Sequence, residues 1–357
     1  MQSNMKILVT GAGGYIGGWI CERFFLNGFK NIRAGIRSWS SAARIGRFPI
    51  EIVLCDVTDP VQIESAINGM DAVIHCAIGS KEVNVNGTKN LLEAALKHRI
   101  KKFIHFSTVD IYGDMEGEIT ESAPLSYSGR VYGDTKIDAE KICWEYGKKG
   151  IPIVVLRPSI VYGPYTKLWI SKFAERIYSG KWGIFSENGE GICNLVYIED
   201  VIRAVLLSLE SDKAVGEAFN INGAELITWN EYFRQLNKAL GLPALREIHP
   251  TKSKLRTSLI TPIKSGARRL LTNHKATITK LYQRSEFIRT MMKRAEQTMA
   301  TIPSKEELNL FAKKPIYVIS KAKKVLGYEP KFNADTGIKL STMWLHHENL
   351  FPFTNRD

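Results

Sequence analysis

The chain has 357 residues, of which 44% are hydrophobic and 24% charged, and its formal net charge is +13. That apolar share is enough for a full core and excludes a disordered chain, and no apolar run reaches the roughly 18 to 20 residues that span a bilayer. The five cysteines are scattered without metal-ligand spacing, so we expect reduced thiols, no bound metal and a cytoplasmic protein.

Short apolar runs alternate with helical patterns over residues 5–160. The predicted strands are Lys6–Thr10, Ile32–Ile36, Glu51–Cys55, Ala72–Ile78, Lys102–Ser107 and Ile153–Arg157. Strands that alternate with helices in this way form a parallel sheet with helices on both faces. We therefore predict an α/β fold, a doubly wound parallel sheet of the Rossmann kind, with a dinucleotide-binding domain over 1–160 and a smaller C-terminal substrate lobe over 161–357.

Three glycines follow the first predicted strand at the spacing G-x-x-G-x-x-G: Gly11, Gly14 and Gly17. Glycine lets the chain turn tightly, lets the backbone approach a pyrophosphate and lets the next helix pack close to the sheet. The free N–H groups at the start of that helix would bind the phosphates. The spacing predicts a dinucleotide site, and an ordinary glycine-rich turn is the alternative.

The residues after the second and third predicted strands bear on which dinucleotide binds. NAD sites usually place an acidic residue after the second strand, where it binds the ribose hydroxyls. This chain has Arg37 there, which favours the 2′-phosphate of NADP, with a solvated surface arginine as the alternative. Asp56 after the third strand is a candidate to receive the adenine amino group, or to serve as a helix cap in the turn that runs to Asp59.

Tyr132 and Lys136 stand four residues apart in a helical pattern and so share one face of the helix. A tyrosine hydroxyl has a pKa of about 10, and a nearby ammonium favours its phenolate form. Ser107 and Thr108 end a predicted strand, where open α/β sheets place their sites, and offer a hydroxyl to hold a substrate oxygen. This set predicts proton transfer beside a cofactor. A solvated helix face is the alternative for the tyrosine and the lysine.

Further along, we predict helices over Ile198–Leu209, Trp229–Leu240 and Ser320–Pro330, with a basic helical segment over residues 246–302. The helix over Ser320–Pro330 should stop at Gly327 and Pro330, since glycine and proline end helices. From Arg246 to Arg294 the chain holds 13 Lys and Arg but only two acidic residues. Apolar residues recur among these charges at helical spacing, as in helices that lie on anionic lipid. The alternative is packing on the second lobe with the charges in water, and specific nucleic-acid binding is not expected.

Together, these motifs resemble an extended short-chain dehydrogenase/reductase of the NAD-dependent epimerase/dehydratase family. The matching stretches are Thr10–Gly17, Asp56–Asp59, His75–Ala77, Asn86–Leu92, Ser107–Gly113, Tyr132–Lys136 and Leu156–Pro164. The resemblance covers most of residues 5–245 and resumes near residue 315. It implies NADP or NAD as cofactor, and it suggests a homodimer through the helices near Val85–His98 and Tyr132–Gly147.

By this resemblance the catalytic residues are Thr108, Tyr132 and Lys136. Thr108 would orient the substrate oxygen, Tyr132 would transfer the proton, and Lys136 would lower the pKa of Tyr132 and hold the ribose. The predicted cofactor-binding residues are Gly11, Gly13, Gly14, Tyr15, Ile16, Gly17, Arg37, Asp56, Val57, Cys76, Ala77, Asn86, Ser107, Tyr132, Lys136, Pro158, Ser159 and Ile160.

Departures from the family pattern narrow the reaction. The 4,6-dehydratases carry Asp-Glu after the catalytic threonine, and fucose-synthase-like members carry a cysteine at the first of these places. Here the two places hold Val109 and Asp110, so neither reaction is expected. Many sugar-nucleotide members have Arg-Asp where Cys193-Asn194 stands and Arg-x-Gly-Asp where Lys314–Tyr317 stands. The bidentate grip of arginine on a pyrophosphate is therefore missing.

The function that we expect is oxidoreduction at a hydroxyl or keto carbon, by an epimerase or a reductase, on a nucleotide-linked or lipid-linked sugar. The stretch Asn194–Val201 is also similar to 3β-hydroxysteroid-dehydrogenase-like members and to ketone reductases, which keeps a hydrophobic substrate as an alternative. An alternative of another class is a sensor that binds NAD(P) without turnover. Because such sensors tend to lose the tyrosine or the lysine, and both are present here, we favour an enzyme.

Overall fold

The computed structural model describes residues 4–248 and 302–350. The predictions for the basic segment, its helices and its contact with anionic lipid concern residues 249–301, which lie outside the described part. The described residues form two compact units. The first takes residues 4–165, 194–225 and 315–333, and the second takes residues 166–193, 226–248, 302–314 and 334–350.

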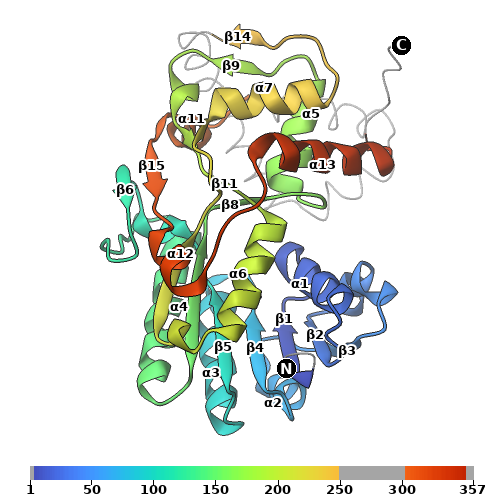
Figure 1. Cartoon of the computed structure of the whole chain (residues 1–357), viewed down its shortest axis with the longest axis vertical. Helices are drawn as coiled ribbons and strands as arrows, with labels where there is room; N and C mark the ends of the chain where they lie inside the picture. The colour runs from blue at the N-terminus through green and yellow to red at the C-terminus, as the bar shows by residue number, and fades with distance from the viewer. Residues whose placement is uncertain (1–3, 249–301, 351–357) are drawn as a thin grey trace, which may run out of the picture. The chain divides into compact units, whose positions relative to one another are not determined.

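A seven-stranded sheet runs through the first unit in the order β12-β7-β5-β4-β1-β2-β3, and every neighbouring pair is parallel. The chain starts near the middle of the sheet and winds outward in both directions, so the doubly wound parallel sheet is confirmed (Figure 1). The strands are β1 (Ile7–Thr10), β2 (Ile32–Ile36), β3 (Glu51–Leu54), β4 (Ala72–His75), β5 (Lys102–Phe106), β7 (Ile153–Pro158) and β12 (Glu217–Ile221). The first six match the predicted strands to within a few residues, and β12 was not predicted.

Five helices of the first unit connect these strands: α1 (Tyr15–Leu26), α2 (Pro60–Ile67), α3 (Gly87–Lys97), α4 (Val131–Lys148) and α6 (Ile198–Glu210). Local sequence explains their ends. Asp59 caps α2 by accepting bonds from the backbone N–H groups of Val61 and Gln62, and Pro60 occupies the first helical position. The predicted helix over Val85–His98 begins instead with a π-helical turn, η4 (Glu82–Asn86), which precedes α3.

A hydrophobic core fills the space between the sheet and α2, α3 and α4. Its members include Leu8, Val73, Phe103 and Val155 from the strands, with Leu91, Leu92 and Cys143 from the helices, and all of these are buried. Burial of such side chains contributes about 1.5 to 3 kcal/mol each. This packing sets the height of α4 over the sheet, which matters because α4 carries two of the predicted catalytic residues.

Two short strand pairs bring distant parts of the chain into the first unit. β8 (Ile160–Tyr162) pairs with β11 (Leu195–Tyr197), and β6 (Gly117–Ile119) pairs with β15 (Pro315–Tyr317), both in parallel. α12 (Ser320–Leu326) follows β15 and stops at Gly327, whose φ of 68° is left-handed, as the predicted stop signal requires. The helix therefore ends at the first of the two predicted stop residues and does not extend to Pro330.

The second unit is built around aromatic side chains. Its helices are α5 (Lys172–Tyr178), α7 (Trp229–Ala239), α11 (Lys305–Ala312) and α13 (Ala334–His347), and its strands pair as β9 (Gly183–Phe185) with β14 (Arg246–Ile248) and β10 (Ile192–Cys193) with β13 (Ile227–Thr228). The buried rings are Phe173, Trp182, Phe185, Trp229, Tyr232, Phe233 and Phe311. Across the described parts of both units, no helix is long and apolar enough to span a bilayer.

Candidate active site

The loop between β1 and α1 has the shape of a phosphate cradle. Gly11 has a φ of +69°, and a Cβ at that position would lie 2.7 Å from the backbone nitrogen of Ala77. A Cβ at Gly17 would run into the carbonyl oxygen of Gly11. Gly14 is the N-cap of α1 and makes no side-chain cap bond, so it leaves the first N–H groups of the helix free for a ligand. The residues present therefore fit the pyrophosphate of a dinucleotide.

The other predicted residues of this loop differ in exposure. Gly13 and Gly14 are exposed, and a Cβ at Gly13 would lie 2.6 Å from the side chain of Ser41. Tyr15 and Ile16 form the first turn of α1 and are half-buried. The Tyr15 hydroxyl is buried and has no hydrogen-bond partner among the described residues. Burial raises the pKa of Tyr15 well above its ordinary value.

Arg37 after β2 is free to meet a ligand, whereas Asp56 after β3 is used in a turn. Arg37 follows β2 directly and is exposed. Asp56 Oδ1 accepts bonds from the Thr58 nitrogen and hydroxyl, at 2.9 and 2.8 Å. Asp56 thus holds a tight turn, while the helix cap is Asp59. Val57 is buried beneath Gly87 at the start of α3.

The segment after β4 runs beside the glycine loop. Cys76 and Ala77 are half-buried, and the Cys76 nitrogen donates to the carbonyl oxygen of Thr10 at 3.2 Å. Asn86 is exposed and donates to Glu82 at 2.7 Å. The carboxyl ends of parallel strands meet at one edge of a sheet. β1 and β4 therefore bring these two segments together.

Asn84 is a buried residue of this segment that our sequence reasoning missed. Its Oδ1 accepts from the Gly79 nitrogen at 3.0 Å, and its Nδ2 donates to the Thr135 hydroxyl at 3.0 Å. It therefore ties the loop after β4 to α4 at Thr135, the residue that directly precedes Lys136. The signal was present in the chain, because Asn84 stands two residues before the stretch Asn86–Leu92 that we compared with the family.

Thr108 and Tyr132 are brought together at the end of β5. Thr108 is buried and caps the 3-10 turn η5 (Val109–Tyr112). Tyr132 is 40% exposed. Burial raises the pKa of Tyr132, while the nearby Thr108 side chain lowers it. Ser107 beside them is buried, and its hydroxyl has no partner among the described residues. These hydroxyls can share a proton with a substrate oxygen.

Lys136 lies one helical turn after Tyr132 and is buried. Its Nζ donates to the carbonyl oxygen of Phe106 at 2.7 Å. Desolvation lowers the pKa of Lys136 to about 8, although Cys143, Cys76 and Glu140 act in the opposite direction. The effect of Lys136 on the pKa of Tyr132, which the sequence predicted, stays a prediction.

The two residues after Thr108 are not placed to act as an acid pair. Val109 is buried in a hydrophobic cluster with Ile111, Tyr112 and Ile137. Asp110 forms an ion pair with Arg130, 3.2 Å from its Nη2. The valine cannot protonate a leaving hydroxyl, which agrees with the sequence argument against dehydration.

The segment after β7 is tied to the segment that carries Asn194. Pro158 ends β7, and the half-buried Ser159 and Ile160 follow it. The Ser159 hydroxyl donates to Asn222 at 2.7 Å, Asn222 donates to Asn194 at 2.9 Å, and Asn194 donates to the carbonyl oxygen of Pro315 at 2.9 Å. Asn194, which directly follows the Cys193 that stands at the arginine place of the compared pattern, is therefore a buried link within the first unit.

Comparison with known proteins identifies the family. Residues 7–222, more than half of the chain, match the model of the NAD dependent epimerase/dehydratase family. An uncharacterized UDP-glucose epimerase of Bacillus subtilis is 28% identical over 326 residues, which cover 78% of this chain and 99% of that protein. The 2-alkyl-3-oxoalkanoate reductase of Stenotrophomonas maltophilia is 26% identical over 274 residues, which cover 72% of this chain and 82% of that protein.

Solved structures show the same fold. The UDP-glucuronic acid 4-epimerase of Bacillus cereus, in complex with NAD, has a TM-score of 0.71 and 23% identity, over 97% of this chain and all of the other. The UDP-glucose 4-epimerase of Thermotoga maritima, with UDP-glucose, has a TM-score of 0.72 and 23% identity, over 96% of this chain and 99% of the other. With the family match over residues 7–222, the chain belongs to the NAD-dependent epimerase/dehydratase family and is an enzyme.

Proposed function

We propose that the enzyme moves hydride between a nicotinamide cofactor and a hydroxyl or keto carbon of a sugar, as an epimerase or a reductase. The observation that carries the proposal is that Thr108 at the end of β5 lies near Tyr132 on α4, with the Lys136 ammonium one turn along α4 and bonded to the carbonyl oxygen of Phe106, the last residue of β5. These groups lie at the edge of the sheet where the glycine loop follows β1. A cofactor in the loop and a substrate oxygen at these side chains would therefore be held next to each other, as hydride transfer requires.

In this proposal each side chain has one task. Thr108 and Tyr132 bind the substrate oxygen, and the proton passes between that oxygen and the Tyr132 hydroxyl. Lys136 holds the ribose hydroxyls and favours the phenolate through its charge. The nicotinamide, when bound, supplies or accepts the hydride. The backbone of Gly11–Gly17 holds the pyrophosphate, assisted by Tyr15 and Ile16 of the first helical turn.

A sugar substrate is supported by the names of the relatives, which include UDP-glucose and UDP-glucuronic acid epimerases. A second candidate is the reduction of a hydrophobic ketone. The relation to a 2-alkyl-3-oxoalkanoate reductase supports it. So does Cys193, a buried thiol at the place where we expect an arginine in sugar-nucleotide enzymes.

We further propose that the enzyme prefers NADP to NAD. Arg37 is exposed directly after β2, with no acidic residue in that position to repel the 2′-phosphate. The dissociation constants of NADPH and NADH, measured side by side, test this preference. Tighter binding of NADH would overturn it.

The function is tested by the ligand that the protein retains on purification, identified by mass spectrometry, and then by turnover. Candidate substrates are UDP-glucose, UDP-glucuronic acid and a 2-alkyl-3-oxoalkanoate. Epimers are detected by NMR, and reduction is followed by the absorbance of NADPH. We expect turnover of one of these classes, and it should be lost in Tyr132→Phe.

Tyr127→Phe is the matched control for that variant. Tyr127 is 52% exposed, and its hydroxyl donates to Asp138 at 2.7 Å. This variant should keep the wild-type rate. NAD(P) binding without turnover on any candidate would favour the sensor alternative, and turnover in Tyr132→Phe would overturn the role of the tyrosine.

The basic segment is proposed to touch anionic membranes, from its composition alone. Flotation with anionic vesicles at low salt tests this contact, and protein that stays at the bottom of the gradient would remove it. A homodimer through α3 and α4 is supported by exposed Leu96 and Val131 on these helices. The molar mass in solution tests the dimer.

A further inference from the structure

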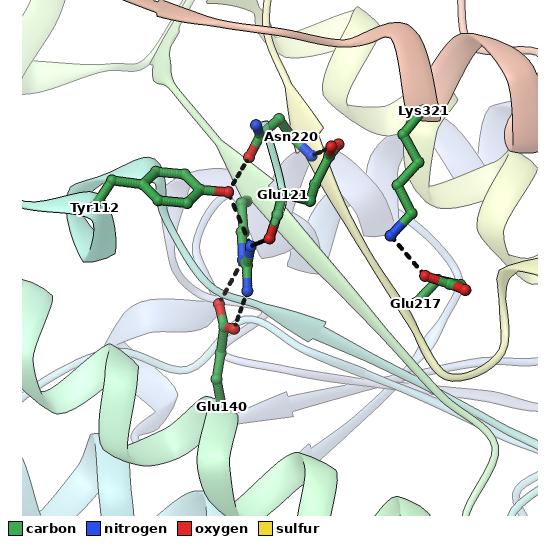
Figure 2. Close-up of polar contacts among 7 residues, drawn as sticks. Tyr112, Glu121, Glu140, Glu217, Asn220 and Lys321 are labelled. Carbon is green, nitrogen blue, oxygen red and sulfur yellow. Dashed lines mark hydrogen bonds and ion pairs between the residues drawn. The ribbon is translucent and has the colours of Figure 1, made fainter. Parts of the chain in front are cut away.

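A buried ion pair lies behind the predicted catalytic residues, between β7 and α4. Arg157 donates through Nε to Glu140 Oε1 at 3.0 Å and through Nη2 to Glu140 Oε2 at 2.7 Å. Arg157 is 4% exposed and Glu140 is fully buried. Figure 2 draws these two bonds as dashed lines that end on the labelled Glu140 carboxylate. Such a fork fixes the direction of both side chains.

The guanidinium makes two more bonds, and these join further segments. Its Nη1 donates to the Tyr112 hydroxyl at 2.8 Å and to the backbone oxygen of Glu121 at 3.1 Å. The Tyr112 hydroxyl donates in turn to Asn220 Oδ1 at 2.7 Å, and the Asn220 nitrogen donates to Glu121 Oε1 at 2.8 Å (Figure 2). We call Arg157, Glu140, Tyr112, Asn220 and Glu121 the Arg157 hub.

Each arm of the hub holds an element that carries a predicted site residue. Tyr112 ends the η5 turn that Thr108 caps. Glu140 lies on α4, one helical turn after Lys136 and two turns after Tyr132. Pro158 follows Arg157 directly in β7. A shift of the guanidinium would therefore move all three elements.

Stability alone is a weak reason for such a hub. A buried ion pair gains little over apolar side chains of the same volume, because both charges lose their hydration. What it supplies is geometry, since the planar guanidinium accepts partners only in fixed directions. The same helix face also places the Glu140 carboxylate among the groups that act on the Lys136 ammonium.

We propose that the Arg157 hub is a positioning device for the proposed function, which holds Thr108, Tyr132 and Lys136 in register, and that Glu140 keeps Lys136 in its charged form. This inference rests on the proposed function, because Lys136 is taken to hold the cofactor ribose. The ionisable groups that act on Lys136 or that it acts on are Cys76, His75, His105, Glu140 and Cys143. Both histidines are neutral at physiological pH, because burial holds their pKa values far below the usual range. Burial also raises the pKa of both thiols. Glu140 acts on Lys136 from one helical turn away, and the Arg157 guanidinium faces the same carboxylate from β7.

The positioning part is tested with Tyr112→Phe, which removes one hydroxyl and keeps the ring. The probe is NADPH, and its affinity is measured by energy transfer from tryptophan. We expect Tyr112→Phe to raise the dissociation constant of NADPH by about 3- to 10-fold at every pH. A change of this size corresponds to the free energy of one hydrogen bond. The matched control is Tyr146→Phe on α4, whose hydroxyl bonds to Glu93 at 3.0 Å. It should change the affinity by less than about twofold.

The electrostatic part is tested with Glu140→Gln. Since the carboxylate raises the pKa of Lys136, its removal should lower the pH at which NADPH affinity declines, from about 8 in the wild type. Tyr112→Phe should leave that midpoint unchanged, because it removes no charge. The control is Glu217→Gln, whose carboxylate pairs with Lys321 at 2.6 Å elsewhere in the first unit (Figure 2).

The outcomes separate this inference from the proposed function. If wild-type protein binds neither NADPH nor NADH, the proposed function fails. If it binds, but Tyr112→Phe behaves like Tyr146→Phe, the hub is structural only and the inference is overturned. If Glu140→Gln does not fold, Tyr112→Phe alone decides. An unchanged midpoint in folded Glu140→Gln overturns the electrostatic role.

Discussion

The glycine loop and the catalytic corner, by which we mean Thr108, Tyr132 and Lys136, lie at the same edge of one sheet but are built differently. In the loop, the backbone is the binding surface, and glycine is needed because a Cβ would collide with Ala77 or with the loop itself. In the corner, side chains carry the chemistry, and buried polar partners hold them in place. Cofactor binding by the loop should therefore be lost when a substitution adds an atom. Turnover at the corner should be lost when a substitution removes one.

The largest effect should come from the corner. We expect Tyr132→Phe to reduce turnover by about 10² to 10⁴, the usual contribution of a positioned acid or base. Its affinity for NADPH should stay within about twofold, because the loop is untouched. Rate and affinity are measured on the same preparation, with Tyr127→Phe beside it. If Tyr132→Phe lost both turnover and NADPH affinity to the same extent, the corner and the loop would not have separate roles.

The sheet between the loop and the corner should also make stability depend on acid, because His75 at the end of β4 is buried with Thr10 and Thr88 on its two ring nitrogens. Desolvation lowers the pKa of His75 to about 3 in the folded state, against about 6.5 when unfolded. Between these values the unfolded chain binds more protons, so stability falls as the pH drops below about 6.5. The loss at pH 5 should be about 2 kcal/mol from this residue.

Urea unfolding at pH 7 and pH 5 measures this dependence, and His75→Gln should reduce it. The glycine loop has no ionisable side chain apart from Tyr15, whose raised pKa lies outside this range. Equal acid sensitivity in wild type and His75→Gln would assign the effect to other groups.

For the loop, Gly11→Ala adds one methyl group at a φ of +69°, 2.7 Å from the Ala77 nitrogen. We expect NADPH affinity to fall by about tenfold or more, with a strain cost of about 1 to 3 kcal/mol in stability. Gly28→Ala is the matched control, since Gly28 has a φ of +85° with nothing within 4 Å of the added carbon. It should lose stability and keep its affinity. If the two variants bind NADPH equally well, the close approach at Gly11 does not serve the cofactor.

The smallest effect concerns the choice of cofactor at the rim of the loop. Arg37→Glu should raise the dissociation constant of NADPH by about tenfold relative to that of NADH, because a carboxylate repels the 2′-phosphate and accepts bonds from ribose hydroxyls. Lys30→Glu changes the same charge before β2, at the opposite end of that strand. In Lys30→Glu, the ratio of the NADPH and NADH dissociation constants should match that of the wild type. An unchanged ratio in Arg37→Glu would make Arg37 a solvated surface residue.

Local sequence predicted most of the first unit because its signals are short-range. The strands from Lys6–Thr10 to Ile153–Arg157 are apolar runs bounded by polar residues, and all six were found. The stop of α12 at Gly327 followed from the left-handed conformation that glycine tolerates. Asp56 shows the limit of such reasoning, because whether it caps a helix or a turn depends on which backbone N–H groups come near it.

By itself, the sequence determined the parallel sheet, the glycine loop and the i, i+4 pair on one helix, because each depends on neighbours within a few residues. Only the tertiary structure decided that β12 adds a seventh strand beside β7, that Asn84 rather than Asn86 is the buried amide, and that Arg157 joins Glu140 to Tyr112. These contacts join residues far apart in the chain. Which buried polar groups find each other is settled by packing, since each must be paired once water has left.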